Sequence, residues 1–364
     1  MNILFAGGGT GGHLYPAVAM ASELLKLVPE ASVSFAGTKT GIEATEVPRL
    51  GYRLHLLPVR GLKRGGSLKA LFSNVAVLAD FAAALFSAAS IIAREKPDVV
   101  IGTGGFVSAP VLLAAQLLGR RTLIQEQNAF PGVTTKLLSL LAREVHLSFT
   151  EAGGYIRRKK RVFVTGNPAR SFPPVSREDA LRRFGLMEPL PTLLVFGGSR
   201  GARSINNALL QWFGAFTSGA NLVWQTGSLD YERISRQVKP SGRLWIGPYI
   251  EHMGDAYAVS DLVMCRAGAS TIAELTNMGK PSVLVPYPHA TGDHQRFNAK
   301  ALVGTGAAML IDDSRLETPG ARQIVLDLLH DSERLASMTA SCNALAHPDA
   351  ARLLAGRIIQ LAKQ

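Results

Sequence analysis

The chain runs twice from a short apolar segment into a glycine-rich turn and then into a helical pattern. The first turn is GGGTGG (residues 7–12) and the second is GGSRG (residues 197–201), which places their first glycines 190 residues apart. Such a turn lets the backbone approach a ligand closely and presents free N–H groups at a helix N-terminus. The repeat therefore predicts two Rossmann-like domains, each binding a ligand at the carboxyl ends of its strands.

Apolar or β-branched segments alternate with helical patterns along nearly the whole chain, which is typical of α/β domains built on parallel sheets. Strands are expected at 2–6, 32–36, 53–57, 98–102, 121–125, 144–148, 161–165, 192–196, 221–225, 243–246, 261–265, 282–285 and 308–311. Helices are expected at 13–28, 68–95, 106–118, 131–142, 200–217, 229–238, 270–278 and 295–304, and in several segments from 318 onward. The Pro- and Gly-rich segment 166–191 is typical of an interdomain linker. The expected fold class is α/β, with two doubly wound parallel sheets.

The charge balance favours an anionic partner. Lys and Arg number 39 against 27 Asp and Glu, a formal net charge of +12. Aromatic residues do not alternate with basic ones, so nucleic acid is not expected as a partner. The two cysteines provide neither a disulfide framework nor a four-ligand zinc site, which favours a reduced, cytoplasmic compartment. The N-terminus lacks the features of a signal peptide, so we expect the chain not to be exported.

Residues 70–93 are long enough to cross a bilayer, but Asp80 lies near the centre of the segment. A carboxylate at that depth costs roughly 2.5–3.5 kcal/mol. We therefore expect a long helix packed on the sheet instead of a membrane span.

The first turn fits the G-x-G-x-x-G pattern of dinucleotide-binding domains, yet the strand that follows it has no acid at its end to hold a ribose. The second half lacks one as well, which argues against NAD or FAD. The Lys-Ser/Thr ending of a P-loop is also missing from both turns.

Three further features carry candidate chemistry. His13 follows the first turn and is either a capping residue or a base, because a helix N-terminus disfavours the charged imidazolium. Glu274 is expected one turn into a helix, either as an ordinary first-turn acid or as an acceptor for ribose hydroxyls. The loop PYPHATGDHQRFNA (286–299) is rich in groups that grip sugars. Its two histidines and one aspartate lack a fourth ligand, so no metal is expected.

Several segments, taken together in their order and spacing, carry a family resemblance: GGGTGGHLYPAVA (7–19), GTGGFVSAP (102–110), QEQNAFPG (125–132), TGNPAR (165–170), GGSRGARSIN (197–206), CRAGASTIAEL (265–275) and HATGDHQRFNA (289–299). Over nearly its whole length the chain shows a resemblance to the MurG family of UDP-GlcNAc transferases, glycosyltransferase family 28. It implies a GT-B fold, with two Rossmann-like domains facing a deep cleft. Residues 1–166 would form the acceptor- and membrane-facing domain and 167–348 the UDP-GlcNAc-binding domain, with a helix at 349–364 packing back on the first.

The same resemblance implies an inverting hexosyltransferase of peptidoglycan synthesis, with a part in cell shape and cell division. GlcNAc would move from UDP-GlcNAc to the 4-hydroxyl of MurNAc in undecaprenyl-pyrophosphoryl-MurNAc-pentapeptide (lipid I), giving lipid II and UDP. Neither a cofactor nor a metal is expected. The implied location is the cytoplasmic face of the inner membrane, as a peripheral protein on an anionic surface, with other cell-wall synthesis proteins as further partners.

The resemblance also implies the roles of individual residues. His13 is our candidate for the catalytic base, with Glu126 as the alternative. Backbone groups of Ile250 would read uracil, Glu274 would bind ribose and Gln295 the GlcNAc hydroxyls. The implied donor-binding set is Thr10, Gly11, Gly12, Asn128, Arg170, Ser199, Ile250, Ala269, Ser270, Thr271, Ile272, Ala273, Glu274 and Gln295. The chain departs from the family at Gln125, where histidine is frequent, and at His294, where a second glutamine is frequent.

A basic and apolar segment offers a membrane contact. The residues concerned are Arg60, Lys63, Arg64, Leu68, Lys69, Leu71 and Phe72. Each basic residue near an anionic surface contributes about 1 kcal/mol to binding. The alternative is a solvated loop that leads into a core helix.

Two other functions remain open at this level. One is another UDP-sugar enzyme on the same scaffold, such as a glycolipid transferase or an epimerase. The other is a binding protein that senses a UDP-sugar without turnover.

Overall fold

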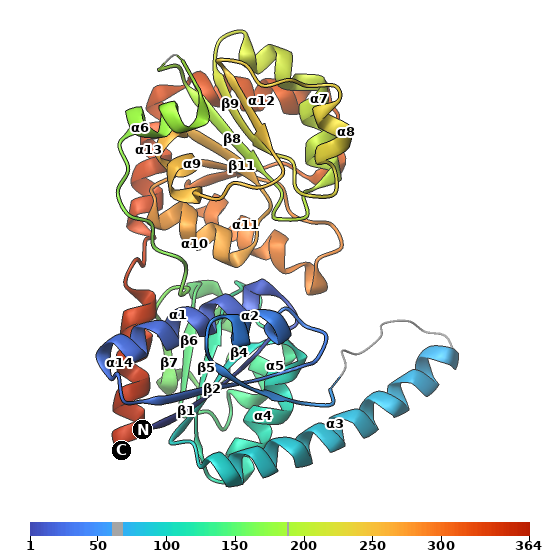
Figure 1. Ribbon diagram of the computed structural model, residues 1–364, viewed down its shortest axis with the longest axis vertical. Coiled ribbons are helices and arrows are strands. Elements are labelled where there is room, and N and C mark those ends of the chain that lie inside the picture. The colour runs from blue at the N-terminus through green and yellow to red at the C-terminus, as the bar shows by residue number, and fades with distance from the viewer. Residues whose placement is uncertain (60–67, 188) are drawn as a thin grey trace. The chain divides into compact units, whose positions relative to one another are not determined.

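The computed structural model describes residues 1–59, 68–187 and 189–364, without the side chains of 68–78. The chain forms two compact units (Figure 1). Unit 1 comprises Met1–Ala169 with His347–Gln364, and unit 2 comprises Arg170–Ala346.

Among the described residues, unit 1 holds a seven-stranded parallel sheet in the order β3-β2-β1-β4-β5-β6-β7. Its strands are β1 (Asn2–Gly7), β2 (Ser32–Gly37), β3 (Arg53–Leu56), β4 (Val99–Gly104), β5 (Arg121–Glu126), β6 (Glu144–Leu147) and β7 (Val162–Val164). Its helices are α1 (Gly11–Leu27), α2 (Glu43–Arg49), α3 (Leu68–Glu95), α4 (Gly105–Leu117), α5 (Val133–Leu138) and α14 (Ala350–Lys363). The strand order reverses between β1 and β4, which is where an open α/β sheet binds its ligand.

Two apolar clusters cover the two faces of the unit 1 sheet. One joins strand residues to helices α3 and α4, and the other joins them to α1 and α14. Leu354, Ile358 and Leu361 bring the C-terminal helix α14 into the second cluster, beside α1 (Figure 1). Strands buried on both faces read as continuous apolar runs, as β1 and β4 do in the sequence.

Unit 2 repeats this plan with a parallel sheet in the order β10-β9-β8-β11-β12-β13. Its strands are β8 (Thr192–Phe196), β9 (Asn221–Gln225), β10 (Leu244–Gly247), β11 (Leu262–Cys265), β12 (Ser282–Leu284) and β13 (Ala308–Leu310). Its helices are α6 (Arg177–Phe184), α7 (Arg203–Thr217), α8 (Tyr231–Ser235), α9 (Met253–Val259), α10 (Ala269–Asn277), α11 (His294–Gly304), α12 (Pro319–His330) and α13 (Ser332–Ala344). The order reverses between β8 and β11, so the second glycine turn also lies at a switch point.

The expected strands are all found close to their predicted bounds, which confirms the α/β class. Three helices were not expected, namely α2, α6 and α9. Helix α6 lies inside the segment 166–191 that was expected to be a linker, and the division between the two units, after Ala169, falls in the same segment. Ser176 caps α6 by accepting from the Asp179 N–H, and Gly185 ends it in the left-handed conformation. The Pro-rich flanks concealed this short helix.

Helix α3 is long, and its described side chains at Ala84, Ala88 and Ile92 are buried against the sheet. This agrees with the expected packing of residues 68–95. Of the described helices, none combines the length and apolarity needed to cross a bilayer.

Candidate functional site

In unit 1, the glycine turn lies at the carboxyl end of β1 and His13 follows it in the first turn of α1. The His13 ring packs against the backbone that leaves β4. A Cβ on Gly104 would lie 2.7 Å from His13 Nδ1, and one on Gly105 would lie 3.3 Å from Cδ2. Both glycines also have positive φ, so this close approach depends on their lacking side chains. The Thr103 hydroxyl donates to the His13 carbonyl at 2.7 Å, which fixes the backbone beneath the ring.

Glu43 stabilises the same glycine turn through hydrogen bonds, although the sequence did not single it out. Its side chain is fully buried. One carboxylate oxygen accepts from the Gly9 N–H at 2.8 Å, and the other accepts from the N–H and hydroxyl of Thr38 at 2.9 and 2.8 Å. A buried charge satisfied by three donors holds the turn in one shape. It also occupies the Gly9 N–H, so the unit 1 turn offers fewer donors to an anion than its sequence implied.

The QEQN segment (125–128) ends β5 beside the His13 ring. Gln127 is buried and its Oε1 lies 3.2 Å from His13 Nδ1. Glu126 is also buried, and both of its oxygens are occupied. One accepts from the Asn128 N–H at 3.1 Å and the other from the Thr135 hydroxyl at 2.6 Å. The carboxylate thereby orders the loop that carries Asn128. Gln127 belonged to a quoted motif, but nothing in the sequence revealed its contact with His13.

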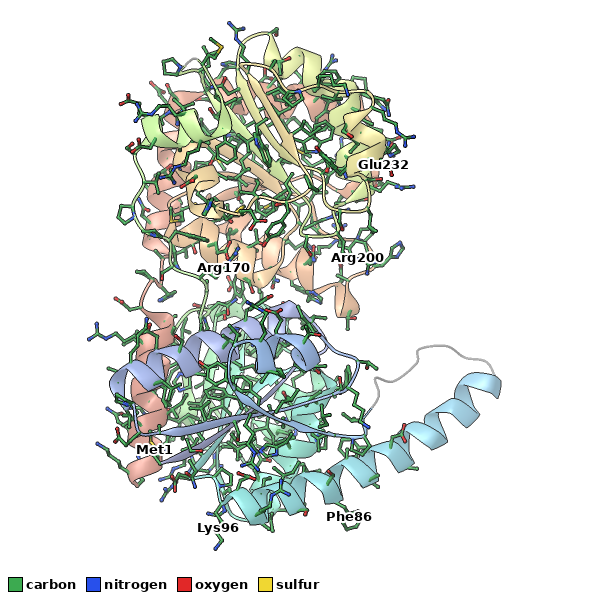
Figure 2. The ribbon with its side chains drawn as sticks, in the orientation of Figure 1. Met1, Phe86, Lys96, Arg170, Arg200 and Glu232 are labelled. Atoms are coloured by element: carbon green, nitrogen blue, oxygen red, sulfur yellow. The ribbon has the colours of Figure 1, made fainter. Side chains whose placement is uncertain are left out.

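In unit 2, a cavity of about 680 Å³ opens at the carboxyl ends of β8 and β11. The second glycine turn lines it through Gly197, Gly198 and Gly201. The rest of the lining comes from Arg200, Arg203 and Arg266 and from the loop that precedes α11. Of the expected donor-binding residues, Thr271 and Gln295 line it. The exposed Arg200 (Figure 2) has no ion-pair partner among the described residues, whereas Arg203 pairs with Asp230 at 3.0 Å. The exposed guanidinium of Arg200 and the helix N-termini suit this cavity to a phosphorylated ligand.

The turn itself depends on glycine. Gly201 has φ of +85°, and a Cβ there would lie 2.1 Å from the Thr226 carbonyl oxygen. Gln225, at the end of β9, ties the turn to the segment after β10. Its amide nitrogen donates to the Gly198 carbonyl at 3.0 Å and its oxygen accepts from the Ile250 N–H at 2.9 Å. The Ile250 N–H is therefore occupied, which leaves its carbonyl group for a ligand. The sequence did not single out Gln225, although a polar residue ending a buried strand is a weak signal for such a role.

Glu274 lies one turn into α10, as the sequence predicted, and its side chain is buried. Both oxygens have partners. Arg170 donates to Oε1 at 2.8 Å and to Oε2 at 3.2 Å, and the Tyr257 hydroxyl donates to Oε2 at 2.9 Å. Burial and the Glu274 charge raise the pKa of Tyr257 well above its ordinary value, so the hydroxyl remains a donor. Arg170, which was expected near the donor, thus forms an ion pair with Glu274, the carboxylate that was expected to bind ribose.

The loop between β12 and α11 positions Gln295. Its Oε1 accepts from the Tyr287 N–H at 2.9 Å, which leaves the amide N–H groups of this cavity-lining residue for a ligand. Arg266, beneath this loop, donates to the Ser204 hydroxyl at 2.9 Å and pairs with Asp313. Across the described part of the chain, no three His, Cys, Asp or Glu side chains gather as metal ligands would.

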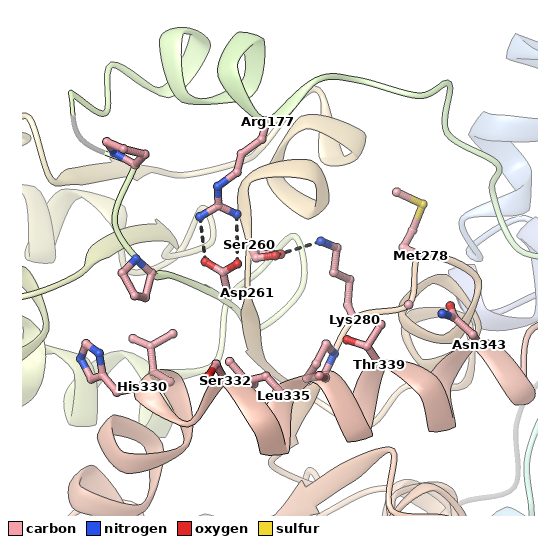
Figure 3. A pocket seen from close by; sticks show the side chains of 16 residues that line it. Arg177, Ser260, Asp261, Met278, Lys280, His330, Ser332, Leu335, Thr339 and Asn343 are labelled. Carbon is pink, nitrogen blue, oxygen red and sulfur yellow. Dashed lines mark hydrogen bonds and ion pairs between the residues drawn. The ribbon is translucent and has the colours of Figure 1, made fainter.

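A second cavity in unit 2, of about 630 Å³, lies at the amino ends of the strands (Figure 3). Arg177 pairs there with Asp261 at 2.8 Å, and Lys280 donates to the Ser260 carbonyl at 2.9 Å. Arg177 is paired with Asp261 and Lys280 is held by a backbone carbonyl, and none of the expected site residues lines this cavity. The carboxyl-end cavity is the candidate site because α/β sheets bind ligands at that edge.

The side chains of the expected membrane-contact residues all lie outside the part of the chain that the structure describes. Arg60, Lys63 and Arg64 lie outside the described residues. Leu68, Lys69, Leu71 and Phe72 fall in α3, but their side chains are outside the description too.

Two Rossmann-like units, each with a glycine turn and polar side chains at its switch point, have the architecture of the GT-B class. Family models match both: the glycosyltransferase family 28 N-terminal domain over residues 3–147 and the family 28 C-terminal domain over residues 192–354. The chain belongs to glycosyltransferase family 28.

Relatives agree over the full length. A protein of Chlorobium limicola named UDP-N-acetylglucosamine--N-acetylmuramyl-(pentapeptide) pyrophosphoryl-undecaprenol N-acetylglucosamine transferase is 78% identical, with all of both chains covered. A protein of the same name from Chlorobium phaeobacteroides is 69% identical, again with all of both chains covered. The crystal structure of Acinetobacter baumannii MurG is similar with a TM-score of 0.78, at 30% identity and with 99% of each chain covered.

Proposed function

We propose that this protein transfers GlcNAc from UDP-GlcNAc to the 4-hydroxyl of MurNAc in lipid I, giving lipid II and UDP. The observation that carries the proposal is the full-length identity of 78% to a relative named for this reaction. The site agrees with it, because the two units offer different chemistry: a phosphate-binding cavity in unit 2 and an imidazole at the switch point of unit 1.

Unit 2 binds the donor. The diphosphate lies in the 680 Å³ cavity against the second glycine turn and the N-terminus of α10, where the exposed Arg200 is a cationic contact. Ser199, Thr271 and the rest of the segment 269–273 supply the further contacts expected there. Glu274 accepts from the ribose hydroxyls, for which Arg170 gives up part of its present ion pair. The Ile250 carbonyl receives a uracil N–H, and the Gln295 amide donates to GlcNAc hydroxyls.

Unit 1 presents the acceptor and the base. Thr10, Gly11, Gly12 and Asn128 contact the sugars. The acceptor 4-oxygen attacks the anomeric carbon of GlcNAc from the face opposite UDP, and its proton passes to the His13 imidazole. The bond from that carbon to the diphosphate breaks, and its electron pair goes to the leaving oxygen. Glu126 orders the Asn128 loop in this scheme, because its own oxygens are already occupied.

Stabilisation of the leaving diphosphate comes from fixed dipoles and arginine. The N–H groups at the start of α10 and the guanidinium of Arg200 face the charge that develops on UDP. These groups stabilise the negative charge on the leaving diphosphate, which a divalent cation does in metal-dependent transferases. Transfer is accordingly expected to be independent of added metal.

UDP release from UDP-GlcNAc tests the reaction, measured with and without a lipid I analogue and repeated in EDTA. Release that requires the acceptor and is insensitive to EDTA supports transfer. Release without acceptor would point to hydrolysis or epimerisation, and tight donor binding without release would point to a sensor. His13→Ala should lower kcat by about 10²–10⁴-fold, the usual contribution of a general base. The matched control His330→Ala, an exposed histidine of the second cavity, should leave kcat unchanged.

We also place the protein on the cytoplasmic face of the membrane that carries lipid I. Large apolar side chains on α4 and the α5 region, which pack side by side, are exposed on unit 1. The exposed side chains are Leu117, Leu118, Val133, Leu137, Leu140 and Leu141, and Lys136, Arg120 and Arg143 are their basic neighbours in sequence. Exposed apolar groups beside cations favour an anionic lipid surface.

Sedimentation with anionic vesicles tests this location. Leu137→Glu with Leu141→Glu should reduce binding, whereas Leu353→Glu, an exposed leucine of α14, is the matched control. Neutralising the expected contact bases at 60, 63, 64 and 69 should also reduce it. Unchanged vesicle binding in both sets of variants would contradict the proposed membrane location. The proposed transferase activity, measured on a soluble acceptor analogue, would be unaffected by that result.

A further inference from the structure

The side chain of Gln127 is buried between three groups that together fix which way its amide faces. Its nitrogen donates to the Thr103 carbonyl at 2.7 Å and to the Gln125 carbonyl at 3.1 Å. It also contacts the side-chain oxygen of Gln125. All three partners are oxygens that only accept. The opposite orientation would place the amide oxygen against them, so the amide nitrogen must stay there and Oε1 must face His13.

The fixed amide determines which nitrogen of His13 carries the proton. Oε1 of Gln127 lies 3.2 Å from His13 Nδ1 and, being an amide oxygen, can only accept. Nδ1 is therefore the protonated nitrogen. A neutral imidazole has one N–H, so Nε2 carries the lone pair. Nε2 has no hydrogen-bond partner within the described part of the chain, and the ring is only half-buried.

We infer that Gln127 is a positioning residue that holds His13 in the tautomer whose Nε2 accepts the proton of the acceptor hydroxyl. The inference rests on the proposed function, in which His13 is the base. The contacts of Gly104, Gly105 and Thr103 fix where the ring lies, and Gln127 fixes its protonation pattern. The carbonyls of Thr103 and Gln125 belong to the carboxyl ends of neighbouring strands β4 and β5, so the sheet itself sets the tautomer. The same logic applies to any enzyme in which a partner group orients a catalytic histidine.

The experiment compares Gln127→Met with the wild-type protein. Methionine keeps the length of the side chain but offers Nδ1 no strong acceptor. Gln116→Met is the matched control, because Gln116 also donates through its amide to a backbone carbonyl, yet its described partners, Thr122 and Leu138, do not include His13. Two readouts are needed: the tautomer of His13 by NMR with isotope-labelled histidine, at a pH where free histidine is neutral, and kcat and KM for UDP release. Loss of one set of signals in His13→Gln assigns the resonances.

The inference expects the wild-type ring to be protonated at Nδ1 and the Gln127→Met ring to be shifted toward protonation at Nε2. It also expects kcat to fall about tenfold or more in Gln127→Met, with KM for UDP-GlcNAc unchanged. This corresponds to the loss of one hydrogen bond that favours the reactive form. The Gln116→Met variant should keep both the tautomer and kcat.

Other outcomes separate the inference from the proposed function. An Nε2-protonated ring in the wild-type protein, or a tautomer unaffected by Gln127→Met, would overturn the inference whatever the activity. A tautomer that shifts while kcat stays constant would retain Gln127 as the group that sets the tautomer but overturn His13 as the base. An equal fall of kcat in both glutamine variants would show loss of packing and would overturn the catalytic part of the inference.

Discussion

Besides its apolar contacts, the C-terminal helix is joined to the unit 1 sheet by an ion pair with one buried carboxylate. Glu144, in β6, pairs with Arg357 of α14 and accepts from His146 at 2.9 Å. Burial by itself would raise the pKa of Glu144, but the hydrogen bonds and charges of His146 and Arg357 lower it from 4.5 to about 2. The replacement Glu144→Gln keeps the shape of the side chain and removes its charge.

The pKa shift gives the size and the pH range of the effect. A lowering from 4.5 to about 2 corresponds to about 3 kcal/mol of stability at neutral pH. Because the folded-state pKa is below the unfolded-state value, this contribution is complete above about pH 4.5 and is lost as the pH falls toward 2. Glu144→Gln should therefore be destabilised at pH 7 and should approach the wild-type protein in acid.

Amide hydrogen exchange in α14 (Ala350–Lys363) is the assay, because it reports the detachment of this helix. A loss of about 3 kcal/mol speeds exchange roughly 100-fold at pH 7. All three tryptophans, at 212, 224 and 245, belong to unit 2, so their fluorescence is an internal control that should not change.

Glu23→Gln provides the matched variant. Glu23 pairs with the exposed Lys26 on α1, and a surface pair of this kind contributes about 0–1 kcal/mol. If Glu144→Gln exchanged no faster than Glu23→Gln at pH 7, or if its deficit persisted undiminished toward pH 2, the assignment of stability to the Glu144 charge would be refuted.

Three shorter predictions concern unit 2. Gly201→Ala should lower the stability of unit 2 by about 2 kcal/mol or more, because the left-handed backbone and the Thr226 carbonyl both oppose a Cβ. Denaturation followed by tryptophan fluorescence measures this loss. The control is Gly214→Ala, where the added Cβ meets open space. Glu274→Gln should weaken UDP-GlcNAc binding about tenfold in calorimetry if the carboxylate binds ribose; equal affinity would exclude that role. Both cysteine thiols should resist alkylation near pH 8 in the folded protein and react once it is unfolded. The reason is that burial raises the pKa of Cys342 to about 11 and that of Cys265 further. Rapid labelling of the native protein would contradict their burial.

The sequence determined the architecture because its signals are local. Strands buried on both faces appear as continuous apolar runs, and each glycine turn marks the place where a strand passes into a helix. The spacing of Gly7 and Gly197 was enough to predict two similar units. The short helices were missed because seven or eight residues carry too little periodicity, and in α2 and α6 prolines inside or beside the helix obscured what there was.

The tertiary structure decided which polar groups are free to act. Glu43, Gln127, Gln225 and Tyr257 contact residues far away in the chain, and no local pattern reports such pairing. Glu126, the alternative candidate for the base, accepts from the Asn128 N–H and the Thr135 hydroxyl, and neither contact could be read from the sequence. The sequence identifies the groups that can take part in the chemistry. Their hydrogen-bond partners, which depend on the order of strands in the sheet, determine which atoms remain available.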